Sequence, residues 1–157
     1  MKEIKPPHSQ EGLHPKVFLA GSIEMGKAVE WQTVATETLK PYVGTVLNPR
    51  REDWDASWEQ TVKNPQFKEQ VNWELDGLDK ADFILVHFDP KTKSPITFGE
   101  FSAHYKRGNI FVSCPKGWWR RGNLEVMCDR AGIPLYESLT DALAAMIKRI
   151  EVMYETK

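Results

Sequence analysis

The chain has 157 residues, and its 21 Lys and Arg nearly balance its 22 Asp and Glu, for a formal net charge of −1. This length favours one domain with a full hydrophobic core. The near-neutral charge gives no support for a nucleic-acid partner. No apolar run approaches the roughly 20 residues that span a bilayer, so we expect no membrane partner either.

The N-terminal residues differ in composition from the rest of the chain. Residues 1–15 are polar, contain three prolines and lack the apolar core of a secretory signal. We therefore expect a flexible extension at residues 1–15, followed by a single domain at residues 16–157. The two cysteines, Cys114 and Cys128, have no metal-ligand spacing, which favours reduced thiols in a cytoplasmic protein. We expect neither a metal nor another cofactor.

Apolar, β-branched runs alternate along the chain with segments of helical periodicity. The pattern predicts strands at 16–20, 44–47, 82–88, 109–113 and 133–136, and helices at 26–40, 67–80, 97–106, 123–130 and from 138 onward. Such alternation is typical of right-handed βαβ units and a parallel sheet. We predict an α/β, flavodoxin- or Rossmann-like three-layer sandwich, with a five-stranded parallel sheet of order 2-1-3-4-5.

The turn after the first predicted strand resembles a phosphate-binding loop. Residues 21–28 nearly match the pattern G-x-x-x-x-G-K-[ST]. However, Ala28 lacks the hydroxyl that would ligate magnesium, and Glu24 adds a negative charge to the loop, so a nucleoside triphosphatase is disfavoured. Gly21 and Gly26 still offer backbone N–H groups that would suit one phosphate or a sugar hydroxyl. A tight turn that binds no ligand is the alternative.

Four segments together resemble the nucleoside 2-deoxyribosyltransferase superfamily, including its 2′-deoxynucleoside 5′-phosphate N-hydrolase branch. They are Val17–Ile23, Gly44–Leu47, Glu74–Asp82 and Ser94–Glu100. Each segment alone is a weak signal, but their order and spacing are specific. The resemblance covers roughly residues 16–136 and implies cleavage of the N-glycosidic bond of a nucleoside or nucleotide.

The resemblance also implies roles for individual residues. Glu100 takes the position of the nucleophilic glutamate, and Glu74 stands where the family usually has an aspartate that contacts or protonates the base. Ser94 stands where the transferases often have aspartate and the phosphate hydrolases have serine. Asn123 corresponds to a residue that reaches the site of a neighbouring subunit, so we expect a homodimer or a higher homo-oligomer.

Breaking a nucleosidic C–N bond requires a carboxylate for the cationic sugar carbon and an acid for the leaving base. We expect Glu100, near a helix N-terminus, to stay ionised because the helix dipole favours negative charge there. It would attack C1′ and form a covalent glycosyl intermediate. We expect Glu74 to be partly desolvated, with a raised pKa, and to act as the acid.

Further polar and aromatic residues follow the predicted strands, where α/β sheets bind ligands. Arg50 and Arg51 would grip a 5′-phosphate or, alternatively, pair with the acidic residues after them. Trp119 would stack on a base or contact another subunit. The expected substrate-binding residues are Gly21, Ser22, Ile23, Gly26, Asn48, Arg50, Arg51, Asp89, Ser94, Trp119 and Asn123.

The sequence thus predicts a nucleoside 2-deoxyribosyltransferase-like enzyme that acts on a (deoxy)nucleoside or its 5′-monophosphate. The sugar would pass from Glu100 to another base or to water. A hydrolase restricted to nucleoside 5′-monophosphates is the first alternative. A non-catalytic nucleotide-binding sensor is the second, because Val17 stands where the family often has a tyrosine that orients the nucleophile.

Overall fold

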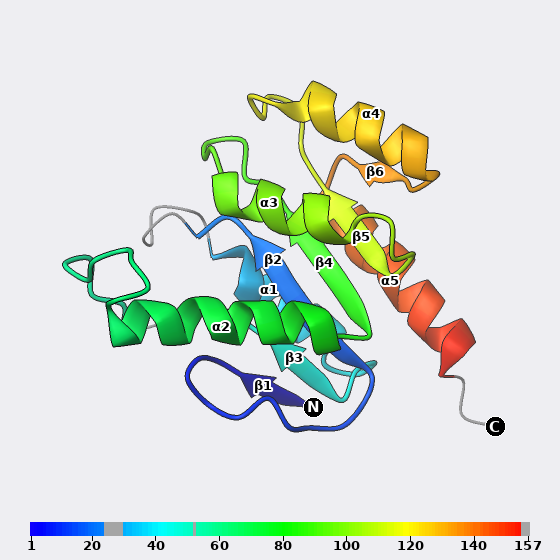
Figure 1. Ribbon diagram of the computed structural model, residues 1–157. Helices are drawn as coiled ribbons and strands as arrows, with labels where there is room; N and C mark the ends of the chain where they lie inside the picture. Colours follow the sequence, from blue (N-terminus) through cyan, green and yellow to red (C-terminus); the bar gives the residue numbers. More distant parts are fainter. Residues whose placement is uncertain (24–29, 52, 155–157) are drawn as a thin grey trace.

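The structure, a computed structural model, describes residues 1–23, 30–51 and 53–154. A parallel sheet of six strands in the order β1-β3-β2-β4-β5-β6 runs through its centre (Figure 1). The strands are β1 (Lys2–Ile4), β2 (Lys16–Gly21), β3 (Thr45–Leu47), β4 (Phe83–His87), β5 (Ile110–Ser113) and β6 (Leu135–Tyr136). The predicted α/β class and the parallel sheet are confirmed.

The predicted number of strands was wrong by one. Strands β2 to β6 are the five expected strands in the expected order, and β1 adds a sixth at the edge of the sheet. It comes from residues 1–15 and pairs with β3, where Lys2 lies opposite Thr45 and Ile4 opposite Leu47. A strand of three residues with a single buried side chain shows no alternation that a sequence pattern could detect.

Helices cover both faces of the sheet. Figure 1 shows α2 (Pro65–Lys80) and α3 (Pro95–His104) in front, with α4 (Arg121–Ala131) beside them. Behind the sheet lie α1 (Trp31–Leu39) and α5 (Leu139–Met153). Successive residues of β2 enter opposite cores, with Phe18 on the α2 side and Val17 on the α1 side. Burial of both faces explains why the strands are nearly continuous apolar runs.

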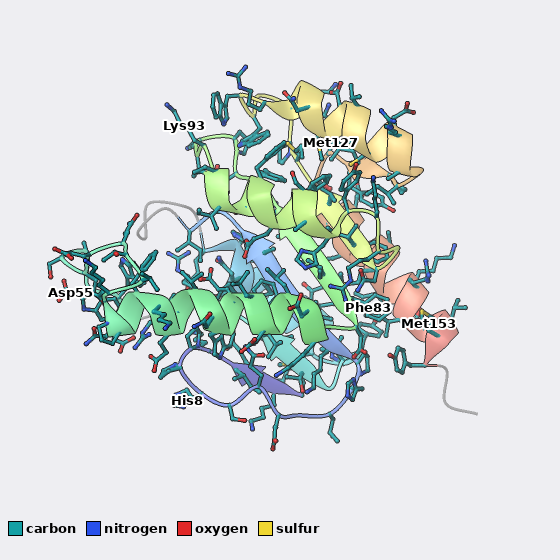
Figure 2. The ribbon with its side chains drawn as sticks, viewed as in Figure 1. His8, Asp55, Phe83, Lys93, Met127 and Met153 are labelled. Carbon is teal, nitrogen blue, oxygen red and sulfur yellow. The ribbon has the colours of Figure 1, made fainter. Side chains whose placement is uncertain are left out.

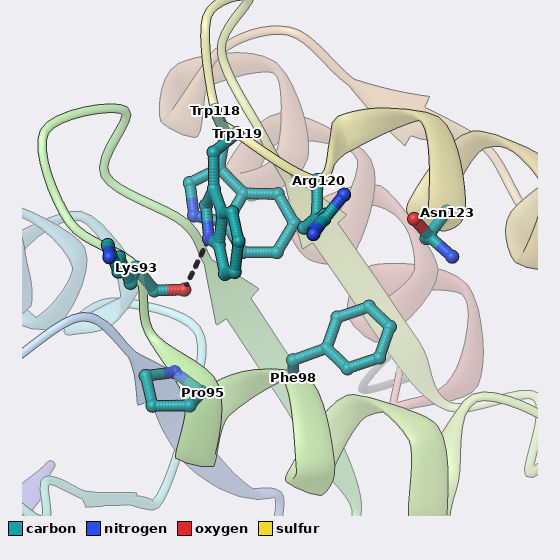
Figure 3. A pocket seen from close by; sticks show the side chains of 7 residues that line it. All are labelled: Lys93, Pro95, Phe98, Trp118, Trp119, Arg120 and Asn123. Atoms are coloured by element: carbon teal, nitrogen blue, oxygen red, sulfur yellow. Dashed lines mark hydrogen bonds between the residues drawn. The ribbon is translucent and has the colours of Figure 1, made fainter.

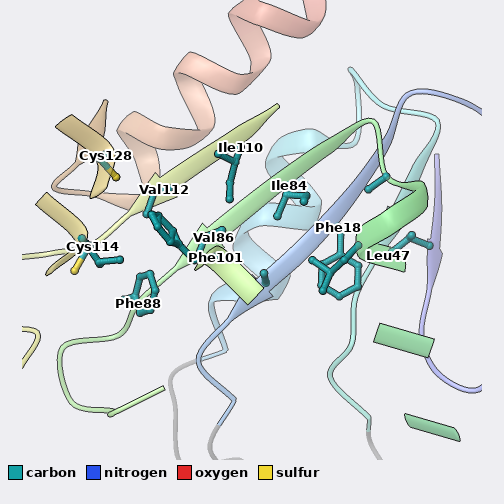
Figure 4. Packing of buried hydrophobic residues seen from close by; sticks show 14 of the residues in the cluster. Phe18, Leu47, Ile84, Val86, Phe88, Phe101, Ile110, Val112, Cys114 and Cys128 are labelled. Atoms are coloured by element: carbon teal, nitrogen blue, oxygen red, sulfur yellow. The ribbon is translucent and has the colours of Figure 1, made fainter. Parts of the chain in front are cut away.

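The orientation of α3 is fixed by aromatic packing. Phe101 is fully buried beneath α3 and packs with Phe88 and Val112 in the core (Figure 4). Phe98 and Tyr105 stack on either side of Phe101, with ring centroids 6.3 and 5.4 Å away. This stripe, with its helical spacing, anchors one face of α3, so Glu100 projects from a different face.

The helix boundaries differ from the predicted ones at several ends. The N-cap of α1 is Glu30, so the helix starts later than the predicted Gly26, which lies outside the described residues. In contrast, α3 starts earlier, at Pro95, because Ser94 adopts a left-handed conformation (φ 48°) that turns the chain into the helix. None of the described helices is long and apolar enough to cross a bilayer.

Candidate active site

The carboxyl ends of β2, β3 and β4 meet at one edge of the sheet, where open α/β folds bind ligands. Three predicted segments leave the sheet there: Ser22 and Ile23, Asn48 to Arg51, and Asp89 to Ser94. The helices α2 and α3 flank this edge (Figure 1). No cluster of His, Cys, Asp and Glu able to hold a metal ion occurs in the part of the chain that the structure describes.

Two predicted catalytic carboxyl groups meet between α2 and α3. Both Glu74 and Glu100 are half-buried. The pKa of Glu100 is raised to about 8, mainly by burial and in addition by the negative charge of Glu74. Burial also raises the pKa of Glu74 to about 7, against the opposing effect of a hydrogen bond from Gln70. The two carboxyl groups are therefore close enough to interact electrostatically.

The expectation that Glu100 stays ionised because of the helix dipole was wrong. Glu100 lies in the second turn of α3, beyond the first turn in which the dipole acts strongly. Desolvation and the neighbouring Glu74 outweigh the dipole there. Because repulsion from Glu74 disappears once Glu74 is protonated, the pair favours a state with one proton. The expected rise in the pKa of Glu74 is confirmed.

The helices α2 and α3 are also joined near their C-terminal ends. Arg107 Nη1 donates to the carbonyl oxygen of Leu78 at 2.8 Å. His104 Nε2 lies 3.7 Å from Asp79 Oδ1. These contacts hold the two helices beside each other, and so they hold the Glu74–Glu100 pair together.

Gln70 is a site residue that the sequence analysis missed. It lies one helical turn before Glu74 on α2 and is buried. Its Nε2 donates to the carbonyl oxygen of Pro49 at 3.0 Å, and its side chain also bonds to Glu74. Gln70 thereby ties the acid-bearing helix to the turn after β3. The spacing of four residues from Glu74 was the one signal available in the sequence.

Two predicted residues, Ser22 and Ser94, form one buried hydroxyl cluster with Thr92, which was not predicted. The hydroxyl oxygen of Ser22 lies 2.5 Å from that of Ser94 and 2.8 Å from that of Thr92. Thr92 and Ser94 are 2.7 Å apart, and the backbone N–H of Asp89 donates to Ser22 Oγ at 2.9 Å. The cluster joins the end of β2 to the loop before α3. It therefore fixes the point at which the Glu100 helix begins.

Gly21 allows close packing at the end of β2. A Cβ at this position would lie 2.2 Å from the Trp31 ring and 2.6 Å from the carbonyl oxygen of His87. Trp31 Nε1 donates to the carbonyl oxygen of Ser22 at 3.1 Å. The half-buried Ile23 follows, and the predicted contribution of Gly26 lies outside the described residues. The absence of a side chain at Gly21 therefore allows Trp31 of α1 to pack against the end of β2.

The two arginines after β3 have different surroundings. Arg51 pairs with Asp53 at 2.7 Å and with Glu69 at 3.3 Å, so ion pairing, the alternative left open by the sequence, holds for Arg51. Arg50 pairs with no carboxylate among the described residues. Its Nη1 donates to Gln32 Oε1 at 3.3 Å, which leaves the other guanidinium N–H groups for a ligand.

Trp119 and Asn123 lie in a separate groove. The groove has a volume of about 400 Å³ and is lined by Lys93, Pro95, Phe98, Trp118, Trp119, Arg120 and Asn123 (Figure 3). Phe98 lines it, and Glu100, two residues further on α3, projects from a different side of the helix. The structure does not bring Trp119 and Asn123 to the carboxyl pair of the same chain.

A family model described as nucleoside 2-deoxyribosyltransferase like matches residues 14–118, which is more than half of the 157 residues. The chain belongs to this nucleoside 2-deoxyribosyltransferase-like family. The matched residues include Glu74 and Glu100 and leave β1 outside. No curated relative matches the chain. The resemblance inferred from four segments is therefore confirmed at the level of the family.

The carboxyl pair predicts a dependence of stability on pH. Both pKa values are raised above the ordinary 4.5, so ionising the pair destabilises the fold. The contribution of the pair to the free energy of unfolding is therefore greatest below about pH 4.5 and is lost as the pH rises through about 7 and 8. Glu100→Gln removes the charge and should gain stability relative to wild type between pH 5 and pH 9, by on the order of 2 kcal/mol. Urea unfolding at both pH values measures the change.

Glu151→Gln, on the exposed part of α5, is the matched control. It should follow the wild-type dependence on pH, because its carboxylate is already in water. An equal response of the two variants would contradict the desolvation of Glu100.

Proposed function

We propose that this protein is an N-glycosyl transferase or hydrolase acting on a (deoxy)nucleoside or its 5′-monophosphate. The observation that supports this most is the coupled pair of Glu74 and Glu100. Both pKa values lie near neutrality, so one carboxyl group can hold a proton while the other is ionised. Membership of the nucleoside 2-deoxyribosyltransferase-like family supports the choice of a nucleosidic bond.

In the first step of the proposed mechanism, ionised Glu100 attacks C1′ of the sugar. The C1′–N bond breaks, its electron pair passes to the base nitrogen, and Glu74 gives its proton to the base. The sugar is then held as an ester of Glu100. Burial is the main reason that Glu100 holds a proton in the free protein, and repulsion from Glu74 adds to it. Protonation of Glu74 removes that repulsion and so favours the ionised Glu100 that the first step requires.

In the second step, an acceptor attacks C1′ and releases Glu100 as a carboxylate. If the acceptor is water, Glu74 takes its proton and returns to the acid form, which gives hydrolysis. If the acceptor is a second base, its nitrogen forms the new bond and its proton passes to Glu74, which gives transfer. Gln70 holds Glu74 during both steps by its contact with the turn after β3.

A non-catalytic nucleotide sensor is the second candidate, and one observation favours it. Val17 has no hydroxyl with which to orient Glu100, and its side chain is fully buried in the core on the α1 side. A sensor would bind nucleotides without releasing the base.

The catalytic proposal predicts the behaviour of two variants. Glu100→Gln should lower the rate of base release by about 10³-fold or more, because the amide cannot form the ester. Glu74→Gln should lower it by about 10²- to 10⁴-fold, because the base must leave without a proton. Chromatography of free bases measures both, over a panel of deoxy- and ribonucleosides and their 5′-monophosphates, with and without a second base.

Glu151→Gln should keep the wild-type rate. Wild-type protein that binds members of the panel but releases no base would establish the sensor instead. A Glu100→Gln variant as fast as wild type would assign the nucleophile to another group.

The proposal includes a homo-oligomer, because Trp119 and Asn123 lie away from the carboxyl pair of their own chain. Trp119 is 53% exposed and would contact a neighbouring subunit. Light scattering at micromolar concentration should give the mass of a dimer or a larger assembly. The mass of one chain would contradict this part of the proposal.

A further inference from the structure

Arg50 lies in a ring of hydrogen bonds that begins in β1. Glu3 Oε2 accepts from Asn48 Nδ2 at 3.0 Å, and Asn48 Oδ1 accepts from the backbone N–H of Arg50 at 3.0 Å. Arg50 Nη1 donates to Gln32 Oε1 at 3.3 Å. Thr36, one turn after Gln32 on α1, closes the ring by donating to Glu3 Oε2 at 3.4 Å. The ring holds both the backbone and the side chain of Arg50.

The ring leaves Gln32 with an unused donor. Gln32 is 1% exposed, and its Nε2 has no hydrogen-bond partner among the described residues. A buried amide nitrogen without a partner is costly, which points to a ligand that accepts from it. The oxygen of the same amide is already used by Arg50. Gln32 and Arg50 therefore present N–H donors only, and their ligand must be rich in acceptors.

The position of these donors favours an anion. Gln32 is in the first turn of α1, where no side chain is acidic and the acidic N-cap, Glu30, is exposed to solvent. The positive end of the helix dipole there adds to the charge of Arg50. Arg50 follows β3, and Glu100 is on the helix after β4, two strands away in the sheet. Two strand spacings are about 10 Å, so Arg50 and Glu100 follow strands that are close together at the same edge of the sheet.

We propose that Gln32 and Arg50 form a subsite for the 5′-phosphate of a nucleoside monophosphate, and that Glu3 is the positioning residue that holds it. This inference rests on the proposed function and narrows its substrate class. A phosphate offers acceptor oxygens and negative charge to match the donors, whereas a sugar hydroxyl would bring a donor of its own. The ring also gives β1, which lies outside the family match, a role in the site.

A second set of contacts fixes the N-terminal segment against α2. Figure 2 shows His8 beside this helix, and the carbonyl oxygen of His8 accepts from Trp73 Nε1 at 2.9 Å. Gln10 Nε2 donates to the carbonyl oxygen of Trp73 at 2.6 Å. Trp73 directly precedes Glu74. The N-terminal segment is thus anchored near both the phosphate subsite and the proposed acid.

Calorimetric titration of the four common 2′-deoxynucleoside 5′-monophosphates and their nucleosides tests the subsite. The titrations use Glu100→Gln protein, so that no turnover disturbs them. The tightest monophosphate should bind better than its nucleoside, and Arg50→Ala should weaken its binding by about 10- to 100-fold. Binding of the nucleoside should not change with Arg50→Ala.

Gln32→Glu separates the two roles that Gln32 can have. Glutamate keeps an acceptor for Arg50, so a residue that only holds Arg50 would tolerate the change. If Gln32 donates to the phosphate, the new negative charge should weaken monophosphate binding by at least about 10-fold and leave the nucleoside unaffected.

A double-mutant cycle tests the positioning role of Glu3. Glu3→Ala should weaken monophosphate binding by about 3- to 10-fold in protein with Arg50, and should have no further effect in Arg50→Ala protein. Glu3→Gln keeps an acceptor oxygen and should restore most of the binding. Glu11→Ala, in the same segment and exposed, is the matched control and should bind like the parent protein.

Equal losses for nucleoside and monophosphate, additive effects of Glu3 and Arg50, or no preference for the monophosphate would each overturn the inference. Base release from nucleosides without such a preference would leave the proposed function intact. Phosphate-dependent binding without base release by wild-type protein would overturn the proposed function and retain the subsite. Absence of binding by every compound would overturn both.

Discussion

The desolvation of two neighbouring carboxyl groups is the constraint on which the site depends. Glu74 and Glu100 would each be ionised at neutral pH in water, but burial raises both pKa values, and repulsion from Glu74 adds to the rise for Glu100. Burying the two carboxyl groups side by side lowers the stability of the fold at neutral pH. Destabilising arrangements of this kind, with strongly shifted pKa values, are found most often at functional sites. In the proposed mechanism, the raised pKa of Glu74 keeps on this residue the proton that the leaving base requires.

The rest of the molecule holds this pair in place. Phe101 anchors α3 in the core, and the buried hydroxyls of Ser22, Thr92 and Ser94 fix the start of that helix against the end of β2. Gln70 ties α2 to the turn after β3. The contacts of Ser22 and Gln70 join segments far apart in the sequence, so the site forms only when the parallel sheet is complete.

The sequence was sufficient to predict five of the six strands and to select two acidic residues that the structure brings together. Strands β2, β4 and β5 are buried on both faces and so appear as apolar runs, and Glu100 was found from the family pattern around it. Strand β1 was missed because three residues carry no periodicity. The hydroxyl cluster joins Ser22 to Ser94, which are 72 positions apart, and no local sequence pattern can predict such a contact.

Electrostatic surroundings were the least predictable feature. The expectation that Glu100 is ionised took account only of the dipole of its own helix. In the structure, α2 brings a second carboxyl group, that of Glu74, beside it. Similarly, the sequence offered Arg50 and Arg51 as equal candidates. The ion pairs of Arg51 with Asp53 and Glu69 depend on where the loop meets α2, and they leave Arg50 as the arginine for a ligand.

The central claim is that Glu100 carries the sugar between the two steps, and mass spectrometry of acid-quenched reactions tests it most directly. During turnover, the peptide that contains Glu100 should carry the added mass of one sugar. With a nucleoside whose base leaves without protonation, the first step no longer needs Glu74, so the adduct should accumulate further in Glu74→Gln protein, which lacks the base for the second step. Turnover without any adduct, or an adduct on another residue, would contradict the account.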